Sequence, residues 1–414
     1  MPLTGERPTL IRGAHLADGR VVDVSIAGGI VTSVVPVGTA PIPTDSRSVL
    51  DLDGHLLLPA TADPHAHLDK AQSWNAIRPP MGDLRAAIVS WRAYADRMTT
   101  DDIVARAHGQ ALRNLSQGST AIRTHVDVLR GAQPLRGIHA LVEVRDMLRG
   151  LMDIEIIALA SDDIPTAVIE SALDAGADGV GGAAHLAPEP LAELDRFIGI
   201  ADRHDCVLDM HTDESLDEAV TLGALAERTR GWSRNVSAGH CVRLGTLEPA
   251  RRDTLIAAVV ASRIGIIANP ITNLYLQGWD HEVATPRGLT AARQLIDAGA
   301  RFAAGADNVR DPFNPLGRAD ALETAMLLVV AGHLDIEEAF TAVSSGAREV
   351  MALPTAGPTP GAVADLLAIK ADSLIEAVAE APAHRTVIHR GAVVSRSTTS
   401  VTYPSLTPAP EAAR

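Results

Sequence analysis

The stretch that decides the fold is LLLPATADPHAH, residues 56–67, an apolar run that ends in polar residues. Seven further runs of this kind follow, and each precedes an amphipathic stretch rich in Ala and Leu. Such alternation is typical of βα units and a parallel sheet. The eight runs are Leu56–His67, Ser119–Val128, Ile154–Ser161, Gly179–His185, Cys206–Glu214, Asn235–Val242, Arg263–Pro270 and Arg301–Asn308.

Eight βα units are the number that closes a (β/α)8 barrel. An open doubly wound sheet also alternates strands with helices, but it usually has fewer strands and often a glycine-rich phosphate turn after the first. The sequence has no such turn after residue 67. We therefore expect an α/β fold built on a TIM-like barrel.

Both ends of the sequence carry short β-branched runs separated by Gly and Pro, as small antiparallel sheets do. We expect the two ends to pair into one β-sandwich. Residues 1–58 and 356–403 form its parts, residues 59–355 form the barrel, and the Pro/Ala-rich tail 404–414 is disordered. The runs are Val21–Ile26, Ile30–Val35, Ser48–Leu52, Ala364–Ile369, Arg385–His389 and Ala392–Val394.

Composition narrows the class of partner. The 414 residues are 46% hydrophobic, enough to bury a large core. A net charge of −15 argues against nucleic acid as a partner, because phosphate binding needs a basic surface. The N-terminus does not resemble a secretory signal, and no apolar run is long enough to span a membrane. We expect a cytoplasmic protein with a small-molecule substrate. We consider a homo-oligomer for its quaternary structure.

Polar residues at the ends of the predicted strands indicate a metal site, since barrel enzymes place their catalytic groups there. In a strand, His65 and His67 point to the same face, and His211 and Asp307 end the fifth and eighth runs. A lone HxH also recurs by chance. Together, three imidazoles and one carboxylate leave a coordination position for water, as catalytic sites do. We predict one divalent metal that activates water.

Proton transfer needs further groups near this metal. Glu214 is suited to general acid/base chemistry, and His240, at the end of the sixth run, can orient or deprotonate the activated water. Asp213 is better explained as a residue that caps the following helix. His125 and His185 are interpreted either as substrate contacts or as packing and supporting residues.

Five motifs, in this order, resemble the amidohydrolase superfamily, and within it the cytosine deaminase group. The resemblance covers nearly the whole chain. The motifs are PHAHLD (64–69), RTHVDV (123–128), HTDE (211–214), NPITNLYLQG (269–278) and DPFNPLG (311–317).

The resemblance implies a role for each matching residue. The metal ligands are His65, His67, His211 and Asp307, the last also counted as catalytic; Glu214 is the proton shuttle and His240 the base that orients the water. Members of the family use zinc or iron. Two-metal members bridge their ions with a modified lysine at the end of the fourth strand. The only lysines here, Lys70 and Lys370, lie elsewhere, so one ion is expected.

Two positions depart from cytosine deaminases, and both concern the substrate. Ser161 replaces a pyrimidine-binding Gln, and Asn308 replaces the Asp after the last ligand. The run 307–311, DNVRD, is more similar to N-isopropylammelide amidohydrolases, although Glu214 resembles the deaminases. Substrate contacts are expected from Ser161, Asn308, His125 and Phe313.

The preferred interpretation is hydrolytic deamination of a small nitrogen heterocycle such as a cytosine-like aminopyrimidine. An enzymatic alternative is hydrolysis of an N-alkylamino triazine or of a cyclic amide at the same metal. An alternative from another class is a non-catalytic scaffold, which the complete ligand set disfavours.

Overall fold

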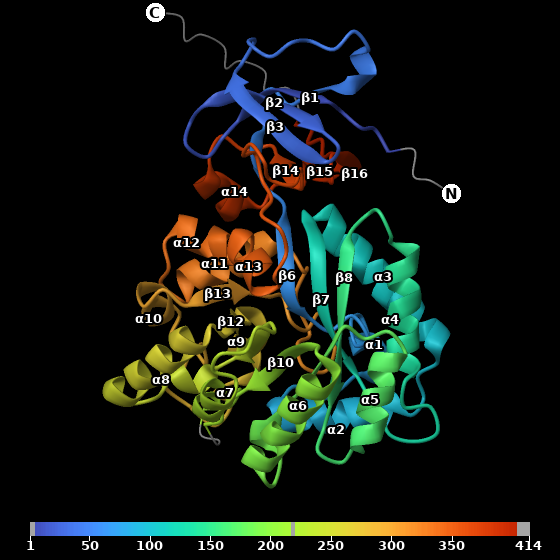
Figure 1. Ribbon diagram of the computed structural model, residues 1–414, viewed down its shortest axis with the longest axis vertical. Helices are drawn as coiled ribbons and strands as arrows, with labels where there is room; N and C mark the ends of the chain where they lie inside the picture. Colours follow the sequence, from blue (N-terminus) through green and yellow to red (C-terminus); the bar gives the residue numbers. More distant parts are fainter. Residues whose placement is uncertain (1–4, 217–219, 404–414) are drawn as a thin grey trace, which may run out of the picture.

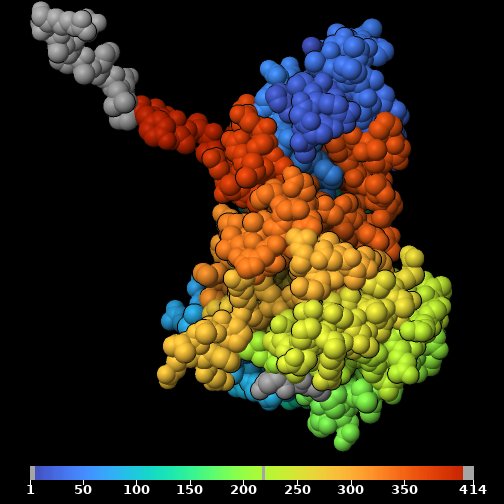
Figure 2. All heavy atoms as spheres, turned by 90° about the vertical axis from the view of Figure 1, so that its left-hand side faces the viewer, coloured from blue at the N-terminus to red at the C-terminus, as the bar shows by residue number. Residues whose placement is uncertain are grey.

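The computed structural model describes residues 5–216 and 220–403, so the predicted tail 404–414 lies outside the described residues. The chain forms an α/β barrel with a second sheet at one end (Figure 1). In the space-filling view, the blue residues that follow the N-terminus and the orange-red residues of the C-terminal part lie together at that end of the molecule (Figure 2). No helix among the described residues is long and apolar enough to cross a membrane.

The barrel sheet contains eight parallel strands in sequence order, and every predicted run contains one of them. The fourth run is shorter than predicted, because its last residues form a 3-10 helix, Ala184–Leu186. The strands are β6 (Thr61–Ala66), β7 (Ser119–Asp127), β8 (Asp153–Ala160), β9 (Gly179–Gly182), β10 (Val207–Thr212), β11 (Val236–His240), β12 (Gly265–Ala268) and β13 (Arg301–Ala304).

Only a few contacts connect the first and last barrel strands, so the barrel is nearly closed. The backbone N–H of Asp307 donates to the carbonyl of His65 at 2.8 Å, and Ala66 forms an isolated parallel bridge with Asp307. The buried carboxylate of Asp63 accepts from the backbone N–H groups of His65 and Ala306. The closure therefore brings the first and last predicted metal ligands together.

Helices surround the barrel and bury their apolar faces against it. Thr99 caps α3 and accepts from the N–H of Asp102. The helices are α1 (Trp74–Ile77), α2 (Leu84–Ala95), α3 (Thr100–Ser116), α4 (Arg136–Met147), α5 (Thr166–Asp174), α6 (Pro190–His204), α7 (Leu222–Arg228), α8 (Pro249–Ser262), α9 (Pro270–Leu276), α10 (Ala292–Asp297), α11 (Ala321–Val330), α12 (Ile336–Ala342), α13 (Ser345–Val350) and α14 (Leu374–Glu380).

The second sheet joins the two ends of the chain, as predicted, because β14 pairs antiparallel with β5. Its further organisation as a sandwich stays a prediction. The strands are β1 (Leu10–His15), β2 (Val21–Ala27), β3 (Ile30–Pro36), β4 (Val49–Asp51), β5 (Leu56–Pro59), β14 (Leu366–Ile369), β15 (Arg385–His389) and β16 (Ala392–Ser397).

Two features of this sheet correct the sequence interpretation. Leu56–Pro59 belongs to the terminal sheet and only Thr61–Ala66 to the barrel, so the first predicted run is two strands. Strand β1 was not expected, because Gly13 interrupts its pattern; Gly13 has a φ of +68°, and the register shifts there. A buried ion pair between Arg385 of β15 and Asp320, the N-cap of α11, ties the sheet to the barrel helices.

Candidate metal centre and pocket

The four predicted ligands converge at the carboxyl ends of the barrel strands. His65 comes from β6, His67 directly follows that strand, His211 comes from β10, and Asp307 lies in the loop after β13. The Nε2 atoms of His67 and His211 are 3.2 Å apart, and Asp307 Oδ1 lies 3.3 Å from His67 Nε2 and 3.7 Å from His65 Nε2. All four side chains are buried.

These separations fit one metal ion shared by the four side chains. With metal–nitrogen bonds of about 2.0–2.1 Å, tetrahedral geometry places ligand atoms about 3.3–3.4 Å apart. Both ring nitrogens of His65 and both carboxylate oxygens of Asp307 are buried without a hydrogen-bond partner among the described residues. Buried polar atoms are rarely left unpaired, so this donor set is arranged for an ion.

The histidines are in the protonation state that a metal needs. Burial, together with the neighbouring imidazoles and Lys70, holds the pKa values of His65, His67 and His211 well below their usual range. The rings are therefore neutral at pH 7, and each can offer a lone pair.

A second candidate cluster, of His65, His125 and Asp209, lies at the same level of burial. Its carboxylate is already held, because Asp209 accepts from buried Arg123 at 2.8 Å and lies 3.5 Å from His125 Nε2. Although burial alone would raise it, these two neighbours lower the pKa of Asp209 to about 2. One oxygen of Asp209 is thus committed to Arg123, whereas both oxygens of Asp307 lack a hydrogen-bond partner among the described residues, so Asp307 is the better ligand.

His240 and Glu214 lie beside the ligand set, as predicted. His240 Nδ1 is 3.6 Å from Glu214 Oε1 and 4.0 Å from Asp307 Oδ2. Burial lowers the pKa of His240 to about 4, against the opposing effect of Asp307, so the ring is neutral at pH 7. The amide of Asn273 donates to Nδ1 at 3.1 Å, which leaves the proton on Nε2.

A pocket of about 630 Å³ opens above these residues. Ser161, Asn308 and Phe313 line it, as expected of substrate contacts, and so do Glu214 and His240. His125 is fully buried and is not among the lining residues, so its expected substrate contact stays a prediction.

Two neighbouring residues have supporting positions. Asp213 accepts from the backbone N–H groups of Thr221 and Leu222 at the start of α7, which confirms its interpretation as a helix-start residue. His185 Nε2 accepts from the backbone N–H of Glu214 at 3.3 Å. Burial lowers the pKa of His185 to about 4, so the neutral ring can accept this bond.

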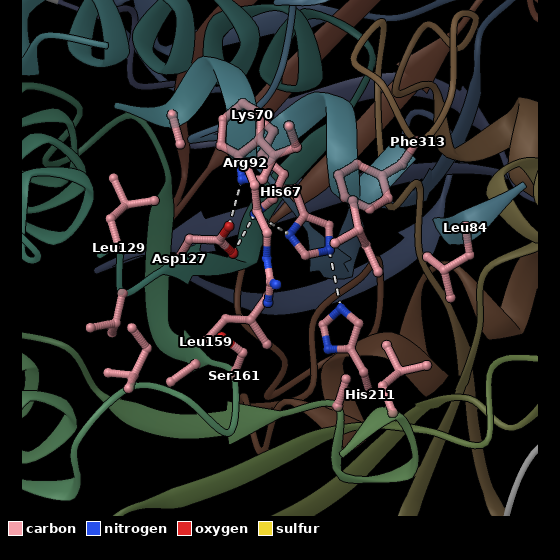
Figure 3. Close-up of a pocket in the computed structure, with 18 of the residues that line it drawn as sticks. His67, Lys70, Leu84, Arg92, Asp127, Leu129, Leu159, Ser161, His211 and Phe313 are labelled. Atoms are coloured by element: carbon pink, nitrogen blue, oxygen red, sulfur yellow. Dashed lines mark hydrogen bonds and ion pairs between the residues drawn. The ribbon is translucent and has the colours of Figure 1, made fainter. Parts of the chain in front are cut away.

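Sequence reasoning missed one wall of the pocket. Lys70 Nζ contacts Asp127 at 2.7 Å and Asp69 at 3.2 Å, and Asp127 also accepts from the indole N–H of Trp91 at 2.6 Å. Figure 3 shows Lys70 reaching toward Asp127 and toward His67, whose Nδ1 is 3.4 Å away. Asp69 belongs to the PHAHLD motif and Asp127 to the RTHVDV motif, but only the fold shows that both carboxylates contact the same lysine.

The arrangement of His65 depends on a glycine in the neighbouring strand. A Cβ atom added to Gly239 would lie 2.7 Å from His65 Cε1 and 2.8 Å from His65 Nδ1. We expect Gly239→Ala to displace this ring and to weaken metal binding about 10- to 100-fold, comparable to losing an orienting contact of a ligand. Titration of metal-free protein with Zn²⁺ measures the change.

Gly109→Ala provides the matched control, because no atom lies within 4 Å of the added Cβ. That variant should bind Zn²⁺ like the unmodified protein. Unchanged affinity in Gly239→Ala would contradict the inferred constraint on His65.

Comparison with known proteins places this geometry in a family. A model described as the amidohydrolase family matches residues 158–395. A pterin deaminase of Rhizobium rhizogenes is 30% identical over 91% of this chain and 88% of its own length.

Two solved structures match nearly the whole fold. A 5-methylcytosine deaminase of Klebsiella pneumoniae, liganded with 5-fluorocytosine, has a TM-score of 0.86 at 26% identity and covers 95% of this chain and 99% of its own. An N-isopropylammelide isopropylaminohydrolase of Burkholderia multivorans has a TM-score of 0.82 at 29% identity, covering 94% and 98%. With a family match over more than half of its residues and a relative aligned along most of its length, this chain belongs to the amidohydrolase family.

Proposed function

We propose that this chain is a mononuclear, metal-dependent deaminase that hydrolyses an exocyclic amino group from a pyrimidine or pteridine ring. The observation that carries the proposal is the placement of Glu214 and His240 beside the four ligands, at the base of one pocket. Similarity to a pterin deaminase and to a 5-methylcytosine deaminase supports this substrate class.

One ion, zinc or iron, would be held by His65, His67, His211 and Asp307. When bound, it supplies a Lewis acid that lowers the pKa of a coordinated water from ~15.7 towards ~7. An N3O donor set suits either metal.

The chain's own residues carry the protons. Glu214 accepts a proton from the attacking water and delivers it to the ring nitrogen next to the amino-bearing carbon. Because Asn273 occupies Nδ1, His240 presents its Nε2–H and can stabilise negative charge that develops on the attacking oxygen. The second proton of the water then passes to the amino group, the carbon–nitrogen bond breaks, and ammonia leaves while the oxygen remains as a carbonyl on the ring.

A second candidate is the release of an alkylamine from a triazine. It is favoured by Asn308 and by the similarity to the N-isopropylammelide isopropylaminohydrolase. The amide of Asn308 donates to Asp311 Oδ2 at 2.8 Å. This hydrogen bond holds an amide at the position where cytosine deaminases have a carboxylate.

The released product separates the two candidates. Purified metal-loaded protein is incubated with pterin, cytosine, 5-methylcytosine and N-isopropylammelide, and ammonia and isopropylamine are quantified. We expect ammonia from at least one pyrimidine or pteridine. Isopropylamine as the sole product would favour the second candidate, and a ring-opened acid would contradict both. A cytoplasmic location and a homo-oligomeric assembly stay predictions.

A further inference from the structure

The pocket extends well beyond the groups assigned to deamination. Its volume of about 630 Å³ lies in the middle of the range for drug-sized ligands, about 300–1,000 Å³. Helix α2 lines one wall of the pocket with Leu84, Ile88, Trp91 and Arg92. The substrate can therefore carry a substituent that reaches this helix.

Most cations that line the pocket are already paired. Lys70 contacts Asp69 and Asp127, and Arg130 forms an ion pair with Asp163. Asp163 also accepts from the hydroxyl of Ser161 at 2.6 Å, so the charge of Arg130 is already paired with a neighbouring carboxylate. Arg85, on α2, also has an interaction partner.

Arg92 differs from these cations. Within residues 5–216 and 220–403, its guanidinium has no hydrogen bond or ion pair, although the carboxylates of Asp96 and Asp162 also line the pocket. Figure 3 shows the side chain pointing from α2 toward the middle of the pocket, on the side of Leu159 and Ser161. A permanently charged group thus faces the space that a substrate would fill.

We propose that Arg92 forms a subsite for a carboxylate on the substrate, so that the preferred substrate is an aminated heterocycle bearing a carboxylate that reaches the wall formed by α2. A guanidinium presents N–H donors in a planar fork that matches a carboxylate with two parallel hydrogen bonds. Arg92 is exposed, and Leu84, Ile88 and Leu159 line the same pocket with apolar side chains. A ligand that fills the pocket would exclude water from the pair and strengthen it relative to one in water. The inference rests on the proposed function for the orientation of the ring.

Matched pairs of rings test this subsite. Pterin is compared with 6-carboxypterin, and cytosine with 5-carboxycytosine, by ammonia release from the metal-loaded protein. For the ring that is accepted, we expect kcat/KM to be at least about tenfold higher with the carboxylate. In Arg92→Ala, this preference should fall about 10- to 100-fold, mainly through KM, and Arg92→Lys should restore part of it.

Arg97→Ala is the matched control, because Arg97 stacks on Tyr94 and does not line the pocket. It should keep the preference of the unmodified protein. Equal kcat/KM for both members of each pair, or a preference that survives Arg92→Ala, would overturn the subsite.

Equilibrium dialysis measures binding of the same rings without turnover, so it tests the subsite independently of the proposed deamination. If none of the rings releases ammonia, the proposed deamination fails, but binding of the same probes still tests the subsite. Tighter binding of a carboxylated ring that is lost in Arg92→Ala supports the inference. Equal binding of carboxylated and neutral rings overturns it.

Discussion

Replacement of His211 by alanine is expected to remove the bound metal and to lower kcat by about 10³- to 10⁴-fold, since Lewis-acid activation of water is worth several kcal/mol and each 1.36 kcal/mol is tenfold. His211 Nε2 lies 3.2 Å from His67 Nε2, so its loss opens the ligand set on one side. Metal content per chain, measured by atomic emission, should fall together with activity.

His333→Ala serves as the control for this experiment. His333 is exposed and contacts Arg287 away from the pocket. It should retain full metal content and activity. Because His211 is buried, circular dichroism must show that His211→Ala is folded. A folded His211→Ala protein with one metal per chain and normal kcat would contradict the assigned site.

Replacement of Glu214 by glutamine should lower kcat by about 10²- to 10⁴-fold while leaving the metal in place, the usual contribution of a general acid/base. Glutamine keeps the size of the side chain, but it cannot take a proton from water. Glu214 lies 3.6 Å from His240 Nδ1, within the group that surrounds the reacting carbon in the proposed mechanism. The measurements are kcat and the metal content of the same sample.

Glu193→Gln is the matched substitution at a site without a catalytic role. Glu193 forms an ion pair with Arg196 on α6 and does not line the pocket. It should leave kcat near that of the unmodified protein. If Glu214→Gln retains normal kcat, the proton-shuttle role is wrong; if it loses the metal, Glu214 supports the ion instead.

The barrel could be predicted from the sequence because its signals are local. Each run places apolar side chains in a strand, and each following helical stretch reports its buried face through a 3.6-residue period. The boundary at Ala60 could not be found in this way. Leu56–Pro59 and Thr61–Ala66 are separated by Ala60 alone, and only pairing with β14, far along the chain, assigns the first of them to another sheet.

The residues of the candidate site differ in the same way in how far the sequence could indicate them. The HxH pair, His211 and Asp307 lie at or just beyond the carboxyl ends of strands, so the barrel rule alone predicts that they converge. Arg92 lies in the middle of a helix, where an arginine is usually a solvated surface residue. No spacing in the sequence indicates that α2 lies beside the pocket.

The sequence by itself therefore determined the number of βα units, and it predicted four side chains that meet at one end of the barrel as the ligands of a single ion. Tertiary structure decided which ends of the chain share a sheet, which carboxylates pair with Lys70, and which cation is left facing the pocket. The physical reason is the distance along the chain over which each effect acts. Strand and helix periodicity act between neighbouring residues, whereas ion pairing and pocket shape depend on side chains such as Lys70 and Asp127, 57 positions apart, that meet only after folding.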